Sequence, residues 1–261
     1  MKTKVSHSRS LAAPSRAALA LPTVAALAMV LLLQLAAPRL HGQDSFNPVI
    51  NGPVFSFLPE PGGTLMLAGN FYSNPPYNFL NALSRLDAAG LDTGTFLPRI
   101  PTTGPQAVAV LPDGTLLECG EFSALNDEPG QPVLSSFMRF SATGSLLPTY
   151  QIHYYVPVYA LAPQADGKVI IGGNFTGLDS APRTMLARYL PTGALDGTFA
   201  PEANDLVFTV ALQPDGQILA GGMFTSLGGQ VRNRIGRLSS TGALDTGFNP
   251  NANGTVVCLL V

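Results

Sequence analysis

The sequence predicts an all-β fold built from tandem repeats, and two observations lead to this prediction. A Gly-x-Phe triplet that follows an apolar run recurs once in each of four copies, with phenylalanines 51, 53 and 49 residues apart at Phe71, Phe122, Phe175 and Phe224. A second series, an arginine followed by a glycine and then an aromatic residue, keeps step with the triplets from Arg85, Arg139, Arg188 and Arg237. Periods of this length indicate stacked supersecondary units rather than one irregular domain.

Each copy contains the pattern of four short strands, which is clearest in the last copy. There the turn sequence Pro214-Asp215-Gly216 separates two apolar runs, and the second run is apolar enough for a strand covered on both faces. The strands expected in this copy span residues 207–212, 218–224, 234–239 and 243–248, with a looser segment at 225–233. Four short antiparallel strands in about fifty residues fit a β-propeller blade better than a helical solenoid, a β-helix or an immunoglobulin-type sandwich.

The repeats are expected to fill residues 43–261. The four-stranded blades fall at approximately 52–103, 104–154, 155–204 and 205–252, and a partial fifth copy begins at residue 253 with a strand over 254–261. Either four blades close an unusual ring, or the sequence is part of a longer chain. We favour the second alternative, an incomplete ring, because an open arc would leave apolar blade faces and strand edges uncovered.

The first 42 residues differ from the rest of the chain. They combine a basic start, which includes Lys2 and Arg9 and no acidic residue, with an almost wholly apolar stretch at 17–37 and a polar exit. This arrangement predicts a secretory signal peptide cleaved near residues 37–43, and an uncleaved membrane anchor is the alternative. We therefore expect a secreted or cell-surface protein without a membrane span after cleavage.

The last copy resembles the bacterial delta-60 repeat. The resemblance rests on the stretch from Gln213 to Phe224, on Arg237-Leu238, and on the stretch from Thr241 to Pro250. It covers essentially everything after the leader and is weakest in the second copy, where Leu147 replaces an aspartate and Glu118-Cys119 interrupts the apolar strand. The resemblance implies a propeller-type scaffold of unassigned function in an exported protein, and it supplies no catalytic residue.

The charge and the cysteine content of the chain bear on which partners and cofactors it is expected to bind. Five of the fourteen basic residues precede Gln43, so the remainder has nine basic and sixteen acidic residues and a net charge of −7. Such a surface argues against nucleic acid as a partner. Cys119 and Cys258 occupy unlike places in the repeat, which favours two buried free thiols over a disulfide. No spacing suggests a zinc site, and we expect neither metal nor cofactor.

The composition also disfavours catalysis. His153 is the one histidine after the leader, and no Gly-x-Ser-x-Gly motif accompanies it. The most regular acidic residues recur at tight turns (Asp113, Asp166 and Asp215) or near the repeated arginines (Asp196 and Asp245). We therefore expect turn residues and Arg/Asp pairs within the blades, and no catalytic residue.

A binding site is expected on the face that carries the loops between second and third strands and the links between blades. These segments vary between copies, whereas the turns on the other face are nearly uniform. The candidate binding residues are Tyr72, Tyr77, Phe79, Asp127, Glu128, His153, Tyr154 and Tyr155. The tyrosines and Phe79 would contact a protein or glycan, or would instead cover the core beneath the loops.

Three functions are compatible with this pattern. The favoured one is an exported, non-catalytic module that binds a protein or a glycan. The first alternative is a hydrolase or lyase that acts on polysaccharide at the mouth of the propeller. The second is a structural piece without activity of its own. The sequence leaves the oligomeric state open.

Overall fold

The described part of the chain is an all-β array of propeller blades. The structure, a computed structural model, describes residues 50, 52–60, 62–69, 71, 83–94, 105–120, 137–147, 156–179 and 181–261. Blade 1 consists of β1 (Val54–Pro59), β2 (Leu65–Gly69) and β3 (Leu83–Leu86). Blade 2 consists of β4 (Pro105–Val110), β5 (Leu116–Gly120), β6 (Phe137–Phe140) and β7 (Leu146–Leu147).

The other two blades share one pattern. Blade 3 consists of β8 (Val158–Pro163), β9 (Val169–Gly173) and β12 (Leu186–Tyr189), and blade 4 of β13 (Val207–Leu212), β14 (Ile218–Gly222) and β17 (Ile235–Leu238). Each also carries a small hairpin, formed by β10 (Gly177–Leu178) and β11 (Ala181–Pro182) in blade 3, and by β15 (Ser226–Leu227) and β16 (Gln230–Val231) in blade 4. All pairings within these sheets are antiparallel.

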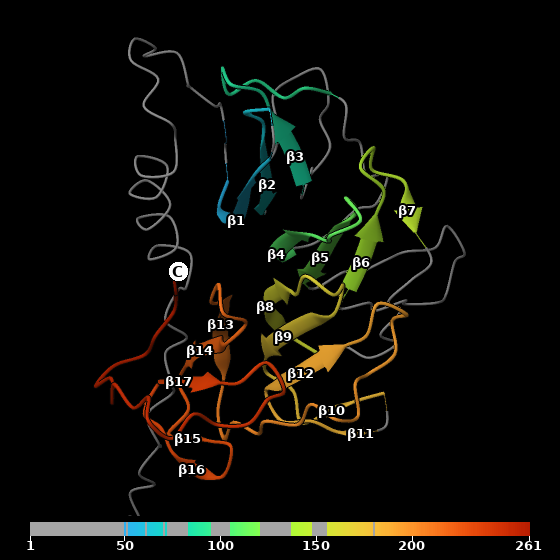
Figure 1. The fold of residues 1–261 in the computed structure, drawn as a ribbon. Coiled ribbons are helices and arrows are strands. Elements are labelled where there is room, and N and C mark those ends of the chain that lie inside the picture. Colours follow the sequence, from blue (N-terminus) through green and yellow to red (C-terminus); the bar gives the residue numbers. More distant parts are fainter. Residues whose placement is uncertain are drawn as a thin grey trace, which may run out of the picture.

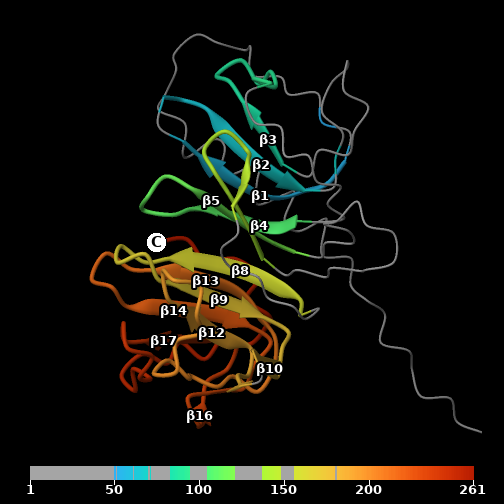
Figure 2. The ribbon, with the colours of Figure 1, turned by 90° about the vertical axis from the view of Figure 1, so that its right-hand side faces the viewer.

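The four blades follow one another around an arc (Figures 1 and 2). The first strand of each blade, β1, β4, β8 or β13, lies nearest the centre of the arc (Figure 1), and the first strands of successive blades contact each other. This arrangement is the one that the repeat predicts, with blade packed on blade around a common axis.

The hairpin turns form where the sequence places Asp-Gly. In blade 4, Asp215 Oδ1 accepts a hydrogen bond from the Gln217 amide at 3.0 Å, and Gly216 adopts a φ of +83° that residues with a side chain rarely take. Asp113 and Asp166 accept equivalent bonds from Thr115 and Lys168. The expected role of these aspartates in turn geometry is therefore confirmed.

The hydrophobic core consists of layers between the blades. Every residue of β2, β5, β9 and β14 is buried, as expected for strands covered on both faces. One apolar cluster joins blades 1 and 2, another joins blades 2 and 3, and a third joins blades 3 and 4. Close approach depends on small residues: a Cβ on Gly172 of β9 would lie 2.6 Å from Val207 Cγ1 of blade 4.

The inner strand of each blade contains an irregularity in its pairing. In β13, Val207 pairs with Gly222 and Thr209 with Gly221, so that Phe208 is the extra residue of a β-bulge. The same shift occurs at Phe55, Gln106 and Tyr159 in the other blades. A bulge re-aims the side chain of the extra residue, and its position here is the same in all four blades.

The expected fourth strand is largely wrong. Among the described residues only blade 2 has one, β7, and in blade 4 the segment expected at 243–248 makes a single bridge between Leu244 and Leu238. Equivalent single bridges join Leu86 to Asp92 and Tyr189 to Leu195. The chain leaves the sheet because Asp245 Oδ1 accepts a hydrogen bond from the Gly247 amide at 2.8 Å, which forms a turn in place of a ladder.

Four further expectations need correction, three in blade 4 and one in the partial fifth copy. The second strand ends at Gly222, and the third begins at Ile235 because Arg234 has a φ of +66°. The segment expected to be loose at 225–233 contains the hairpin β15–β16. Residues 254–261 form no strand, although the Val256 amide donates a hydrogen bond to the Gly222 carbonyl at 3.1 Å.

The proposed leader at 1–42 lies outside the described residues. Within the described ranges no helix is long and apolar enough to span a membrane.

Candidate functional site

All eight residues of the expected binding face lie outside the described part of the chain. Tyr72, Tyr77, Phe79, Asp127, Glu128, His153, Tyr154 and Tyr155 therefore stay predictions. The described residues contain three other features that a site could use: a network around the repeated arginines, a cavity between blades 2 and 3, and a row of side chains on the inner strands.

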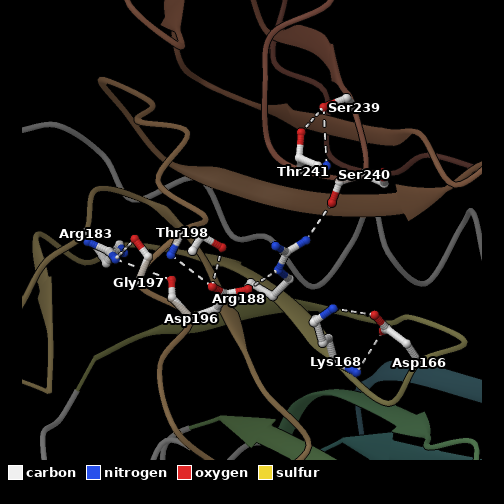
Figure 3. A network of polar contacts seen from close by, with 10 residues as sticks. All are labelled: Asp166, Lys168, Arg183, Arg188, Asp196, Gly197, Thr198, Ser239, Ser240 and Thr241. Carbon is white, nitrogen blue, oxygen red and sulfur yellow. Dashed lines mark hydrogen bonds and ion pairs between the residues drawn. The ribbon is translucent and has the colours of Figure 1, made fainter.

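The repeated arginine of blade 3 is at the centre of a polar network (Figure 3). Arg188 Nε donates to Asp196 Oδ2 at 2.8 Å, and both side chains are only 7% exposed. Arg188 Nη1 donates to the Ser240 carbonyl of blade 4 at 2.5 Å, and the guanidinium lies 4.5 Å from the ring centroid of Phe199. Arg188 therefore joins two blades and supports the aromatic residue of its own repeat.

The repeated arginine of each other blade also pairs with an acidic residue, but this residue comes from different positions in the repeat. Arg237 pairs with Asp245 at 2.7 Å, as expected. Arg85 pairs with Glu60 at 2.7 Å, and Arg139 pairs with Asp113. The expected Arg/Asp pair is confirmed in blades 3 and 4. In blades 1 and 2 the equivalent aspartate positions hold Thr93 and Leu147, so a carboxylate near the first turn replaces it.

These contacts keep the aspartates ionised. At Asp196, burial opposes ionisation, yet hydrogen bonds from Thr198 and Arg188 outweigh it and lower the pKa. The hydrogen bond from Arg237 is the largest cause that lowers the pKa of Asp245. Hydrogen bonds from Thr115 and from Lys168 likewise lower the pKa of Asp113 and of Asp166. A general acid requires a raised pKa, so these four aspartates are unsuited to that role.

A second set of arginines has the same structural character and was missed by the sequence reasoning. Arg183 donates to the carbonyls of Pro182, Asp196 and Gly197. Arg232, 49 residues later, makes the equivalent bonds to the carbonyls of Val231, Asp245 and Thr246. Each fastens the small hairpin of its blade to the turn after the third strand. The signal that could have found them is their shared 49-residue spacing.

A cavity of about 420 Å³ opens between blades 2 and 3, on the face of the regular turns. Its lining includes Asp113, Arg139, Asp166 and Pro191. Its size suits a small molecule, but its aspartates are held by the turn and ion-pair contacts described above. Across the described ranges, no group of three or more His, Cys, Asp or Glu side chains could hold a metal ion.

The inner strands supply the most distinctive set of side chains. The four bulge residues, Phe55, Gln106, Tyr159 and Phe208, are all half-buried. Tyr159 and Phe208 come from neighbouring blades, and their ring centroids lie 5.5 Å apart at 43°. The strands that carry the four residues are in sequential contact, so the bulges place three aromatic residues and one glutamine at the same position of neighbouring inner strands. We call this set the axial row.

The two cysteines are not joined. Cys119 is buried and Cys258 is exposed, so the expectation of two buried thiols holds for Cys119 only. Burial is the largest cause that raises the pKa of the Cys119 thiol, and its Sγ lies 3.6 Å from the Val158 carbonyl of blade 3. A buried thiol with a raised pKa is unreactive, and Cys119 serves packing.

Comparison with known proteins identifies the repeat but no activity. Residues 164–199 and 213–248 match the model of a β-propeller domain of unknown function, DUF5122. No curated protein matches the chain.

Several solved structures have a similar fold but a very different sequence. They include a gluconolactonase from Xanthomonas campestris (14% identity, TM-score 0.40, 69% of this chain and 57% of that one). They also include a protein of unknown function from Bacteroides caccae (11% identity, TM-score 0.42, 74% of this chain and 65% of that one). A third is PorZ, a surface component of the type-IX secretion system of Porphyromonas gingivalis (12% identity, TM-score 0.40, 79% of this chain and 28% of that one).

The chain spans less than two thirds of each of these proteins. At such low similarity they indicate no substrate or partner. The two matched segments coincide with the most regular repeats, blades 3 and 4, and support a β-propeller repeat family for this chain.

Proposed function

We propose that this chain is an exported, non-catalytic β-propeller protein of the delta-60 repeat type, and that it binds a glycan at the axial row. One observation carries the proposal: the same bulge in all four inner strands holds an aromatic residue or a glutamine, and the rings of Tyr159 and Phe208 lie 5.5 Å apart. A blade needs no aromatic residue at this position, because blade 2 has Gln106 there.

The chemistry of the row suits a sugar chain. Rings such as those of Tyr159 and Phe208 offer flat apolar faces for the C–H faces of a sugar, and the Tyr159 hydroxyl and the Gln106 amide are groups that bond hydroxyls. The absence of basic clusters after the leader makes nucleic acid an unsuitable ligand. The loop residues Tyr154 and Tyr155 would extend the site on the variable face.

The described acidic groups support a role without catalysis. Asp113, Asp166, Asp196 and Asp245 serve turns or ion pairs and have lowered pKa values. Hydrolysis of a glycosidic bond needs a paired acid and base or nucleophile. Turnover of a bound polysaccharide would therefore contradict this part of the proposal.

The test is a glycan-binding screen with the purified protein and the double variant Tyr159→Ala/Phe208→Ala. We expect the dissociation constant of the selected glycan to rise at least about tenfold, because two stacking surfaces are lost. Leu91→Ala is the matched control, since Leu91 is an exposed apolar residue in a turn of blade 1. Tyr159→Phe keeps the ring and separates stacking from hydrogen bonding.

Three results would overturn the glycan assignment. They are unchanged binding in a folded double variant, equal loss in Leu91→Ala, or capture of a protein ligand by a wild-type chain that retains no glycan. Tyr154→Ala/Tyr155→Ala tests the loop face separately.

Export is tested on the native host protein. The basic start and the apolar stretch at 17–37 support cleavage. We expect the mature protein outside the cytoplasm with a new N-terminus near residues 37–43, as read by N-terminal sequencing. An intact leader on a membrane-bound protein would favour the anchor.

A further inference from the structure

Glu118 lies in the layer between blades 1 and 2. In β5 it stands opposite Val108 of β4 and Met138 of β6, so that these three side chains share one face of the sheet. Val108 and Met138 belong to the apolar cluster that also contains Met66 and Ala68 of blade 1. Glu118 therefore projects towards blade 1, and it is 0% exposed.

The carboxyl group of Glu118 has no polar partner there. Neither of its oxygens makes a hydrogen bond with any residue that the structure describes. The equivalent positions of blades 1, 3 and 4 hold Leu67, Ile171 and Ala220, so the blade architecture does not require a carboxylate. An ionised carboxylate without partners is very costly in such surroundings, and desolvation raises the pKa of Glu118 to about 8.

The described strands around Glu118 supply no compensating charge. On the described strands of blade 1, Arg85 of β3 is the one charged residue on the side of this layer, since it stands opposite Met66. Arg85 already binds Glu60 at 2.7 and 2.9 Å and the Ala142 carbonyl at 3.1 Å. In blade 2, Arg139 of β6 and Cys119 of β5 belong to the opposite face, towards blade 3.

We propose that the layer between blades 1 and 2 is a pH-sensitive joint, closed while the Glu118 carboxyl is neutral and loosened when it loses its proton to solvent. In the closed joint the neutral carboxyl packs among apolar side chains. Ionisation favours any state in which water reaches the carboxylate, and separation of β2 from β5 gives such a state. The hydrogen bonds of these strands then lose the packing that protects them from exchange. The layers between blades 2 and 3 and between blades 3 and 4 have Ile171 and Ala220 at the equivalent positions. These residues do not titrate, so the two layers do not loosen as the pH rises.

The test is native-state hydrogen exchange of the full chain between pH 6 and pH 9, with rates corrected for the intrinsic effect of pH. An ordinary carboxyl pKa in the open state and a pKa of about 8 in the closed state imply a loss of protection of roughly hundredfold over this range, levelling off above pH 8. Peptides covering β2 and β5 should show the loss. Peptides covering β14 should not.

Two variants remove the titrating group. Glu118→Gln keeps the shape, and Glu118→Ile introduces the residue of blade 3. In either variant the protection of β2 and β5 should be independent of pH over the same range. The proposal is overturned if wild-type protection is constant from pH 6 to pH 9, if the loss persists in the variants, or if β14 opens in parallel. Should one variant fail to fold, the other decides.

Discussion

At the scale of single residues, the ion pair of the repeated arginine is buried to different degrees in different blades. Arg188 and Asp196 are almost inaccessible, whereas the side chains of Arg237 and Asp245 are 26% and 30% exposed. The chemistry of the two pairs is the same, and both arginines lie over the aromatic residue of their repeat, at 4.5 Å from Phe199 and 4.6 Å from Phe248. Burial therefore decides how much each pair contributes to stability.

This difference predicts unequal effects of the same substitution. Asp196→Ala leaves the Arg188 guanidinium buried beside an empty space and should lower the free energy of unfolding by about 2–3 kcal/mol. Asp245→Ala is the matched control and should have a clearly smaller effect, because water can solvate Arg237. Urea denaturation of both variants measures the difference. Equal losses would show that burial of the pair does not matter.

At the scale of elements, contact between blades depends on the absence of side chains on the second strand. A Cβ on Gly172 would lie 2.6 Å from Val207 Cγ1 and 3.1 Å from Val210 Cγ2. Such a distance requires the side chain of Val207 or the two blades to shift. The glycines of the repeat are thus packing residues in the sheet as well as turn residues at its corners.

The corresponding prediction concerns Gly172→Ala. The added methyl group should destabilise the protein by about 1–3 kcal/mol through overpacking between blades 3 and 4. Gly197→Ala is the control, because a Cβ there meets nothing within 4 Å. Thermal unfolding of the two variants is the measurement. An unchanged midpoint for Gly172→Ala would mean that the layer can absorb the methyl group.

The elements also show how much of the fold the sequence could predict. The first strand of the last copy was predicted at 207–212 and observed at Val207–Leu212, because apolar runs and Asp-Gly turns are local signals. The fourth strand failed because the side chain of Asp245 competes with the ladder, a choice made by one hydrogen bond. The axial row was missed because a one-residue bulge leaves the repeat period unchanged.

At the scale of the whole molecule, ionisable groups act on stability in opposite directions. Asp113, Asp166, Asp196 and Asp245 have lowered pKa values, so the stability that they contribute is present above about pH 4 and is lost as the pH falls. Glu118 has a raised pKa, so its stabilising neutral form is lost as the pH rises towards about 8.

We therefore expect the free energy of unfolding to be greatest at mildly acidic pH, near 4–5, and to fall on both sides. Urea denaturation from pH 3 to pH 9 gives the profile. In Glu118→Gln the decrease above pH 5 should vanish while the acid decrease remains. A wild-type profile that rises steadily to pH 9 would contradict the assignment of Glu118.

The pairing of a valine with a glycine across successive blades has a consequence for how such a chain can evolve. Val207 packs against Gly172, and Val256, 49 residues later, packs against Gly221 in the same manner. A gene segment encoding one such unit could be duplicated or exchanged between these two places, since the glycine side of one unit is complementary to the valine side of the next. Cys119 occupies the place of that glycine in the second copy, where it packs in one cluster with Val158, the counterpart of Val207 in blade 3. The valine is thus retained across the copies while the residue that it meets differs, so exchange of a unit between copies would require that contact to be repacked.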